Sequence, residues 1–390
     1  MRVRARIPEV EMAVMEEPKE CPYDECEGRY FKPHQKACWR SVRDTQLEEV
    51  RVSRQKCLSC GRTHRVFPKG VQANQQQTDR MKGVSILFYI LGMSYRGVED
   101  MLTALGFHLS YSTVYRNVQA AGQQVRRLKS STLKQSGSKI RVVGGDLTYV
   151  ECQGEQAIIG VAIDVEQGIV LDIELLDNEE ADTIETWLKP LLESVGAEVL
   201  LSDDQDAFKQ SADAAAVEHQ ICRRHVTLNV LEFVTKTAEQ VLEKSPAIPD
   251  DLNVTIDQFL EDLETLEWIM LGHPWNALAL LETLFQRYSA AKAPKKHHRA
   301  SLWYRMRNHV LRLWNNWARH TCYREFLRRD DISIDHTNNK TEQIIGWNIK
   351  ERYRTMRCYK RKASILNIAT LTSWLRENSD LQDMNLLFSC

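Results

Sequence analysis

Acidic residues at three separate places in the chain have the types and positions of divalent-metal ligands. Asp146 lies within "GGDLTYV", a predicted strand that otherwise avoids acids, and Asp203 follows the apolar run "VLL" in "VLLSDDQDAF". Glu342 lies on a helix predicted to begin near Asn338 or Asn339. A carboxylate inside a core-forming strand is costly unless it is paired or binds a cation. Three converging carboxylates suit Mg2+ or Mn2+, and two such ions could activate a water or a 3′-hydroxyl in phosphodiester chemistry.

Each acid also has a purely structural interpretation. Asp146 could be a satisfied strand acid, and Asp203 could cap the helix that "DQDAFKQSADAA" begins. The stretch "NKTE" has the spacing of a capping box, with Asn339 at the N-cap and Glu342 three residues later. Taken singly, these interpretations are at least as good as catalysis, so only the joint pattern can decide.

Four cysteines near the N-terminus form two close pairs, in "CPYDEC" and "CLSCG". Two such pairs separated by a loop bring four thiolates around zinc, and the sequence therefore predicts a structural zinc ribbon. His34 and Cys38 are also available as ligands, and buried free thiols are the simpler alternative. The predicted zinc ligands are Cys21, Cys26, Cys57 and Cys60.

Charge is segregated along the 390 residues, although the formal net charge is only -1. Residues 51–140 contain 15 Lys or Arg and 3 Asp or Glu, whereas residues 146–206 contain 17 Asp or Glu and one Lys. A basic part beside an acidic part suits a protein that holds a polyanion with one and divalent cations with the other. A chance distribution of solvated faces is the alternative.

The sequence indicates an intracellular protein without a membrane partner. It has no run of about 18 apolar residues that could span a bilayer. The stretch "MRVRARIPEVEMAVMEEPKE" has charges where a secretory signal would need an apolar core. Cysteines in such a chain are expected to be mostly reduced, which favours metal over disulfides for the close pairs.

Helices are predicted directly after the cysteine-rich segment. The stretch "TDRMKGVSILFYILG" has helical spacing and a plausible cap at Thr78. Next, "SYRGVEDMLTALG" and "SYSTVYRNVQAAGQQVRRL" predict two amphipathic helices joined at "GFHL", which matches a helix-turn-helix. Short helical hairpins also occur in proteins that never touch DNA, but the zinc ribbon and the basic surplus favour DNA binding. The second helix would direct toward a DNA groove Ser112, Thr113, Tyr115, Arg116 and Asn117.

The pattern changes after a polar linker rich in Ser, Gly and Lys. The segments "IRVVGGDLTYVEC", "QAIIGVAIDV" and "GIVLDIELL" predict an antiparallel meander, which a helix and the short strand before Asp203 follow. Residues 232 to about 330 are almost wholly helical in pattern. We therefore expect an α/β domain interrupted by an all-helical block.

The motifs "GGDLTYV", "SDDQDAF", "CRRH" and "HTNNKTE", in this order, resemble those of the DDE transposases of bacterial insertion sequences. The resemblance is to the broad group of Mutator-like and IS256-like enzymes, which carry a C-x2-H signature after the second Asp. It covers about residues 140–240 and 332–360. The N-terminal modules look like the zinc ribbon and helix-turn-helix of ISL3-type transposases.

This resemblance implies an RNase H-like catalytic domain with an all-helical insertion. Asp146, Asp203 and Glu342 are then the catalytic acids and the ligands of two Mg2+ or Mn2+ ions. Asp204 stands where such enzymes often have Gly, so it is a rival to Asp203 as the metal ligand. Expected to support the active site are Cys222, His225, Asp204, Asn338 and Asn339. Expected to contact DNA after the last acid are Lys350, Arg352, Arg354 and Arg357.

The implied function is that of a transposase that binds terminal inverted repeats, cleaves DNA and transfers strands. It would act as a homodimer or larger homo-oligomer on double-stranded DNA, in the cytoplasm of a prokaryote and in association with the nucleoid. A transposase-derived regulator without cleavage, or an RNase H-like nuclease without strand transfer, are the alternatives. The predicted divisions are a zinc ribbon at 1–70, a helix-turn-helix domain at 71–130, a linker at 131–139, the catalytic domain at 140–231 and 332–390, and the helical insertion at 232–331.

Overall fold

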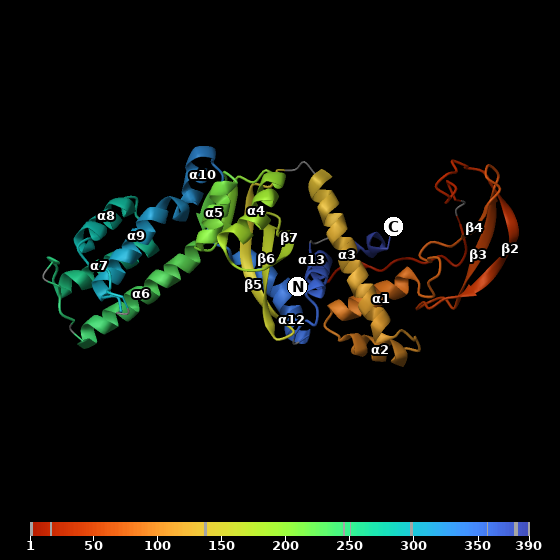
Figure 1. The fold of residues 1–390 in the computed structure, drawn as a ribbon, viewed down its shortest axis with the longest axis horizontal. Helices are drawn as coiled ribbons and strands as arrows, with labels where there is room; N and C mark the ends of the chain where they lie inside the picture. Colours follow the sequence, from red (N-terminus) through yellow and green to blue (C-terminus); the bar gives the residue numbers. More distant parts are fainter. Residues whose placement is uncertain are drawn as a thin grey trace.

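The computed structural model describes residues 3–15, 18–135, 139–244, 246–249, 251–296, 299–356, 358–377 and 381–388. The molecule is elongated, with a five-stranded sheet in the middle, a small N-terminal sheet at one end and a helical block at the other (Figure 1). Within the described residues, no helix combines the length and the apolar character that crossing a membrane requires.

The N-terminal sheet carries the paired cysteines. Its three antiparallel strands lie in the order β2-β3-β4, around a small core that includes Val50, Val52 and Val71. Cys57 ends β3, and the turn that follows holds Cys60. The strands are β2 (Phe31–Ser41), β3 (Glu49–Cys57) and β4 (Thr63–Val66).

Three helices follow this sheet and agree closely with the predicted ones. The Thr78 hydroxyl accepts a hydrogen bond from the Met81 N–H at 3.2 Å, and the Ser94 hydroxyl accepts one from Gly97 at 2.9 Å, so both helices start at the expected caps. The third helix runs past its predicted end, so the expected linker at 131–139 begins as helix; residues 136–138 lie outside the described residues. The helices are α1 (Asp79–Ile90), α2 (Tyr95–Ala104) and α3 (Tyr111–Gln135).

The central sheet has the strand order β7-β6-β5-β8-β9. Its first three strands are antiparallel, as the predicted meander requires, and β8 and β9 run parallel to β5. The helix α4 lies between β7 and β8 in the chain, and α5 lies between β8 and β9, which are the crossovers that parallel neighbours need. The elements are β5 (Val142–Cys152), β6 (Glu155–Asp164), β7 (Ile169–Leu176), α4 (Ala181–Val195), β8 (Val199–Ser202), α5 (Asp206–Ala214) and β9 (Glu218–Ile221).

The helical block has a hydrophobic core of its own, in which Phe259, Tyr288 and Trp303 are buried. Its first helix begins at Arg223, so the block starts nine residues earlier than the predicted boundary at 232. That long helix extends away from the central sheet, and the other helices of the block pack beside it (Figure 1). The helices are α6 (Arg223–Lys244), α7 (Ile256–Gly272), α8 (Ala277–Tyr288), α9 (Leu302–His320) and α10 (Cys322–Asp330).

The last part of the chain returns to the central sheet. Its helix α13 is buried and packs against both α3 and β7. A Cβ at Gly122 would lie 2.3 Å from the Asn367 carbonyl oxygen, so the absence of a side chain there lets α3 and α13 cross closely. One hydrophobic core therefore joins α1 to α3 with the central sheet, and the predicted division near 131–139 does not separate two cores.

The elements of this last part are short apart from α13. A parallel pair of two-residue strands, β1 and β10, joins the two ends of the chain. The elements are β1 (Ala5–Arg6), α11 (Asn339–Ile345), a π-helical turn (Gly346–Lys350), α12 (Glu351–Met356), α13 (Lys362–Arg376), β10 (Gln382–Asp383) and a 3-10 turn (Met384–Leu387).

Candidate active site

Two of the predicted acids lie on adjacent parallel strands. The register pairs Gly144 of β5 with Leu201 of β8. Asp146 lies two residues beyond Gly144, and Asp203 lies two residues beyond Leu201. Because the two strands run in the same direction, Asp146, within β5, and Asp203, directly after the end of β8, lie at matching positions beside each other.

The helix α11 brings the third acid, Glu342, to the same part of the sheet, next to β5. A Cβ at Gly144 would lie 2.4 Å from the Thr341 hydroxyl oxygen, so only glycine lets α11 pack onto β5 at this point. The Asn338 side-chain amide donates a hydrogen bond of 3.1 Å to the Gly145 carbonyl oxygen and fastens the start of the helix to the strand. Glu342, in the first turn of α11, is thereby held close enough to Asp146 for its charge to raise the pKa of that carboxyl.

Burial and mutual repulsion show that the three acids share one site. Burial, together with the charges of Asp203 and Glu342, raises the pKa of Asp146 to about 7, against the lowering effects of the Leu147 N–H and of Lys350. Burial also raises the pKa of Asp203, against the opposing effects of the Gln205 N–H and His225. A site that crowds carboxylates away from water binds a divalent cation favourably, since the cation relieves the repulsion.

One carboxylate oxygen of this site has no hydrogen-bond partner. Glu342 Oε1 is buried and makes no hydrogen bond within the described part of the chain. The nearest group is His225, whose Nε2 lies 3.4 Å from that oxygen without hydrogen-bonding alignment. The charges of Asp203 and Glu342 both act on Asp146, and one oxygen of Glu342 is left without a hydrogen-bond partner. Carboxylate oxygens are the ligands that Mg2+ or Mn2+ prefers, so the chemistry of these residues fits the expected ions.

Asp204, the rival to Asp203, is engaged in ion pairs. Its carboxylate lies 2.7 Å from Lys209 Nζ and 2.8 Å from the Arg312 guanidinium, and its backbone carbonyl accepts a 3.0 Å hydrogen bond from Arg312. Asp206 lies in the first turn of α5 and pairs with Lys209 at 2.9 Å. Of the three neighbouring acids, Asp203 is the one whose charge acts on Asp146.

The C-x2-H motif contacts the helix that carries the last acid. The Asn338 backbone N–H donates to the Cys222 thiol sulfur at 3.2 Å, and His225 lies beside Glu342. The ligand atoms of Cys222, His225 and Glu342 all lie within 4.8 Å of one another. In addition, Arg224 donates a 3.0 Å hydrogen bond to the Asn339 side chain. The motif is therefore placed to support the active site.

The capping-box interpretation of "NKTE" is wrong. The N-cap residue is Asn338 rather than Asn339, and its side chain makes no capping hydrogen bond. The amide of Asn338 bonds to β5 instead, and Oε1 of the Glu342 carboxylate lies beside His225 and makes no hydrogen bond back to the helix end. Tertiary contacts with the strand have taken the place of the local cap.

The four basic residues predicted to contact DNA after Glu342 do not all lie on one exposed surface. Lys350 and Arg354 are exposed, and Lys350 is close enough to Asp146 to lower its pKa. Arg352 is only 2% exposed; it donates to the Met93 carbonyl at 3.0 Å and stacks over a tyrosine ring of α1. The prediction that Arg352 contacts DNA is therefore wrong, because its charge is used inside the protein. Arg357 lies outside the described residues.

The predicted DNA-facing residues of α3 also divide into two groups. Ser112 and Arg116 are exposed, and Thr113 is half-buried next to Arg116. Tyr115 packs edge-on against a tyrosine of α2, and Asn117 is only 7% exposed. The prediction that Asn117 faces a DNA groove is wrong, because this side chain is used in a hydrogen-bonded pair beneath the surface.

The four predicted cysteines form one cluster. Cys21 Sγ lies 3.8 Å from Cys60 Sγ, and Cys26 Sγ lies 3.7 Å from Cys57 Sγ. All four sulfur atoms lie within 4.8 Å of one another, whereas His34 and Cys38 are exposed on β2 outside the cluster. The Arg62 backbone N–H and the neighbouring thiols lower the pKa of Cys60 to about 6, which favours the thiolate at this position, whereas the other thiols raise the pKa of Cys26 to about 12. The donor set fits a structural zinc ion.

Sequence reasoning missed the two basic residues that hold Asp204. Arg312 reaches it from α9 in the helical block, more than a hundred residues away in the chain, and Lys209 reaches it from α5. The strongly basic character of residues 295–330 was the available signal, with 10 Lys or Arg against 2 Asp or Glu. Nothing in that composition indicates which of these side chains turns toward the catalytic acids.

Comparison with known proteins identifies the family. The family described as "Transposase, Mutator family" matches residues 58–258, which is more than half of the chain. The chain belongs to the Mutator family of transposases. The family expected from the motifs is thereby confirmed, and this Mutator-family chain carries its three acids at one site.

Relatives of this Mutator-family chain include transposases of staphylococcal insertion sequences. It is 27% identical over 136 residues to the transposase for insertion sequence element IS257 in transposon Tn4003 of Staphylococcus aureus. The same identity and length are found with the transposase for insertion sequence-like element IS431mec of Staphylococcus aureus strain Mu50. These matches cover 35% of this chain, and the chain spans 59% of the length of these curated relatives.

Solved structures similar to parts of this chain include integrase cores. The catalytic core domain of HTLV-2 integrase in complex with magnesium, in its trimeric form, is 14% identical with a TM-score of 0.20 and covers 34% of this chain and 85% of its own. The catalytic core domain of BIV integrase is 12% identical with a TM-score of 0.18 and covers 52% of this chain and 93% of its own.

Proposed function

We propose that this protein is a DNA transposase that uses a DDE triad to cleave DNA at the ends of an insertion sequence and to transfer the freed strands. The observation that carries the proposal is the convergence of Asp146, Asp203 and Glu342, from a strand, a strand end and a distant helix, on one half-buried site. Membership of the Mutator family supports it.

The finer assignment of the catalytic domain is to the RNase H-like fold. Three antiparallel strands followed by two parallel ones, in the order β7-β6-β5-β8-β9, support this assignment. The first acid then lies on the central strand β5 and the second directly after β8. The helical block between the second and third acids is an insertion with its own core.

The carboxylates of Asp146, Asp203 and Glu342 would hold two Mg2+ or Mn2+ ions. When bound, such ions activate the attacking water or 3′-hydroxyl and stabilise the leaving oxygen. His225 and Cys222 keep Glu342 and the start of α11 in position, through the contacts described above. Lys350, exposed beside Asp146, would contact the phosphate at the reaction centre.

The N-terminal part would recognise DNA. The cysteine cluster would hold a structural Zn2+ and organise the sheet β2-β3-β4, and the helices α1 to α3 would form the helix-turn-helix module. Because two ends of an element must be held together during transposition, we expect a homodimer or larger homo-oligomer on double-stranded DNA. A cytoplasmic protein associated with the nucleoid follows from the same proposal.

A cleavage assay tests the proposal. Purified protein is incubated with Mg2+ or Mn2+ and a DNA carrying the ends of its own element, and wild type is compared with Asp203→Asn, Glu342→Gln and Asp204→Asn. We expect Asp203→Asn and Glu342→Gln to abolish cleavage, since each removes a metal ligand. Asp204→Asn should lose no more than about 10- to 100-fold, as substitutions of groups that support metal ligands do.

Two outcomes would contradict parts of this proposal. Cleavage that survives Asp203→Asn but is lost in Asp204→Asn would show that Asp204 is the metal ligand. A wild-type protein that binds the element ends and cleaves nothing with either ion would instead be a regulator derived from a transposase.

A further inference from the structure

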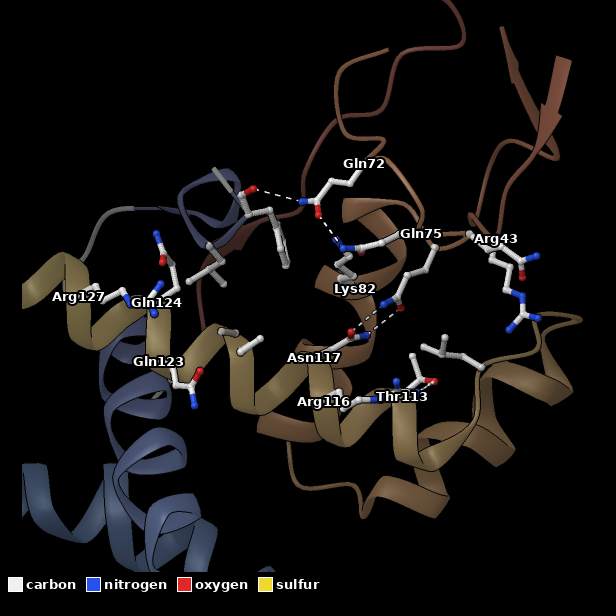
Figure 2. A pocket seen from close by; sticks show the side chains of 17 residues that line it. Arg43, Gln72, Gln75, Lys82, Thr113, Arg116, Asn117, Gln123, Gln124 and Arg127 are labelled. Carbon is white, nitrogen blue, oxygen red and sulfur yellow. Dashed lines mark hydrogen bonds between the residues drawn. The ribbon is translucent and has the colours of Figure 1, made fainter. Parts of the chain in front are cut away.

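A polar groove lies beside α3 and lacks acidic side chains. Its deeper part, of about 930 Å³, lies between α3 and the segment 72–77 that precedes α1 (Figure 2). An adjoining hollow of about 670 Å³ shares Gln123 and Arg127 with it and continues along α3 to Ser131. The ionisable residues that line the deeper part are all basic: Arg43, Lys82, Arg116 and Arg127.

The α3 side of the groove is one continuous helix face. Arg116, Ala120, Gln123 and Arg127 are all exposed, and their spacing of four, three and four residues places them in line along the helix (Figure 2). From Arg116 to Ser131 this face extends over about 22 Å, at about 1.5 Å per residue. The groove is therefore much longer than a small molecule; a length of DNA duplex of about 22 Å carries about six phosphates on each strand.

Only some of the amide side chains in the groove are available to a ligand. Gln77 and Asn117 are hydrogen-bonded to each other in both directions, at 2.9 and 3.0 Å, and so attach the segment 72–77 to α3. In contrast, the side chains of Gln76 and Gln123 are exposed and make no hydrogen bond within the described part of the chain. Each presents a donor and an acceptor toward solvent.

The basic side chains of the groove also differ in whether an acidic partner compensates their charge. Lys82 pairs with Asp79 at 2.7 Å, so its charge is already compensated. Arg43, Arg116 and Arg127 are exposed; Arg43 and Arg116 donate hydrogen bonds only to uncharged oxygens, and no residue lining the deeper part carries a negative charge. Uncompensated arginines favour a polyanion, and unpaired glutamine amides match the adjacent donor and acceptor of an adenine edge. Duplex DNA offers both.

We propose that this groove is the surface that reads the element-end duplex, with Gln76 and Gln123 on base edges and Arg43, Arg116 and Arg127 on phosphates. The inference rests on the proposed function and deepens it, because it assigns recognition to the middle of α3 rather than to its N-terminal tip. It also explains why Asn117 is buried: that residue builds the groove and does not read DNA.

A binding experiment without catalysis tests the inference. Fluorescence anisotropy compares the full-length protein on a duplex of its own terminal repeat and on a scrambled duplex of the same composition, over a series of salt concentrations and without Mg2+ or Mn2+. The variants are Gln123→Ala and Arg127→Ala. The controls are Gln286→Ala and Lys189→Ala, which remove a glutamine amide from α8 and a positive charge from α4.

Each groove variant has its own expected signature. Arg127→Ala should weaken binding to both duplexes alike and reduce the slope of log K against log salt by about 1. Gln123→Ala should lower the preference for the terminal repeat over the scrambled duplex by about tenfold, with little change on the scrambled duplex. The two controls should behave as wild type does.

The failure of this inference differs from the failure of the proposed function. If wild type prefers the terminal repeat and both groove variants retain wild-type affinity, preference and salt slope, the groove is not the reading surface, although the transposase proposal stands. If wild type neither prefers the repeat nor cleaves it when Mg2+ is added, both are wrong. A stronger affinity for single-stranded RNA than for the repeat, lost in the variants, would also overturn the assignment to duplex DNA.

Discussion

Asp146→Asn should stabilise the protein in the absence of divalent ions while it removes a proposed metal ligand. Burial and the neighbouring acids raise the pKa of this carboxyl from an ordinary value of 3.8 to about 7. Between these two values the unfolded chain is ionised and the folded protein keeps the proton. The folded state therefore binds more protons, and its free energy of unfolding falls as the pH rises from about 4 to about 7.

The size of this effect follows from the same shift. A change from 3.8 to about 7 corresponds to at most about 4 kcal/mol of lost stability above pH 7. Asparagine has no charge to bury, and its side-chain oxygen can still accept the 2.8 Å hydrogen bond that Leu147 donates to Asp146. At pH 8 we therefore expect the midpoint of thermal unfolding to rise by up to about 5 °C in the variant.

Thermal unfolding of both proteins, measured between pH 5 and pH 8 without added Mg2+ or Mn2+, checks this expectation. The advantage of Asp146→Asn should shrink as the pH is lowered and should stop growing above pH 7. With Mg2+ at about 100 times its dissociation constant, wild type should gain about 2.7 kcal/mol and the variant much less, because the variant has lost a ligand.

The neighbouring acid Asp206 supplies the control. It is 82% exposed, and Lys209 lowers its pKa, so Asp206→Asn should give no gain at pH 8. A variant Asp146→Asn that is no more stable than wild type at pH 8, or whose advantage is the same at pH 5 and pH 8, would refute the reasoning that the three acids repel one another in a buried site.

Three further substitutions test the neighbour of Glu342, the packing of α11 on β5, and the cysteine cluster. His225→Ala should reduce cleavage by about 10- to 100-fold and raise the Mg2+ concentration needed for half-maximal cleavage, because Glu342 loses its neighbour. A changed melting temperature with unchanged metal dependence would contradict a positioning role for His225. Gly144→Ala should destabilise the protein by about 1–3 kcal/mol and impair cleavage, since the alanine methyl group would collide with the Thr341 hydroxyl. An unchanged melting temperature would be evidence against this packing of α11 on β5. Cys60→Ser should lower the zinc content measured by metal analysis and abolish binding to the element ends; full zinc content would exclude this cysteine as a ligand.

Local features of the chain were predictable because their causes are local. The caps at Thr78 and Ser94, the antiparallel meander and the strand before Asp203 follow from hydrogen-bonding side chains and from apolar spacing within a few residues. The order of the acidic motifs also sufficed to indicate the family, which the Mutator-family match confirms. The metal ions, the zinc site and the DNA contacts stay predictions.

Side-chain direction depended on distant parts of the chain and could not be predicted from local pattern. Arg312, from the helical block, forms an ion pair with Asp204, so Asp203 is the neighbouring acid that interacts with Asp146. The Asn338 amide donates a hydrogen bond to β5 instead of capping its own helix. Arg352 and Asn117 have the residue types of DNA contacts, yet packing against other segments buries both. The chain thus specified which elements form and in what order the acids occur. Their convergence, and the choice between neighbouring carboxylates, came from tertiary packing, because only the folded chain brings a charged partner from a hundred residues away.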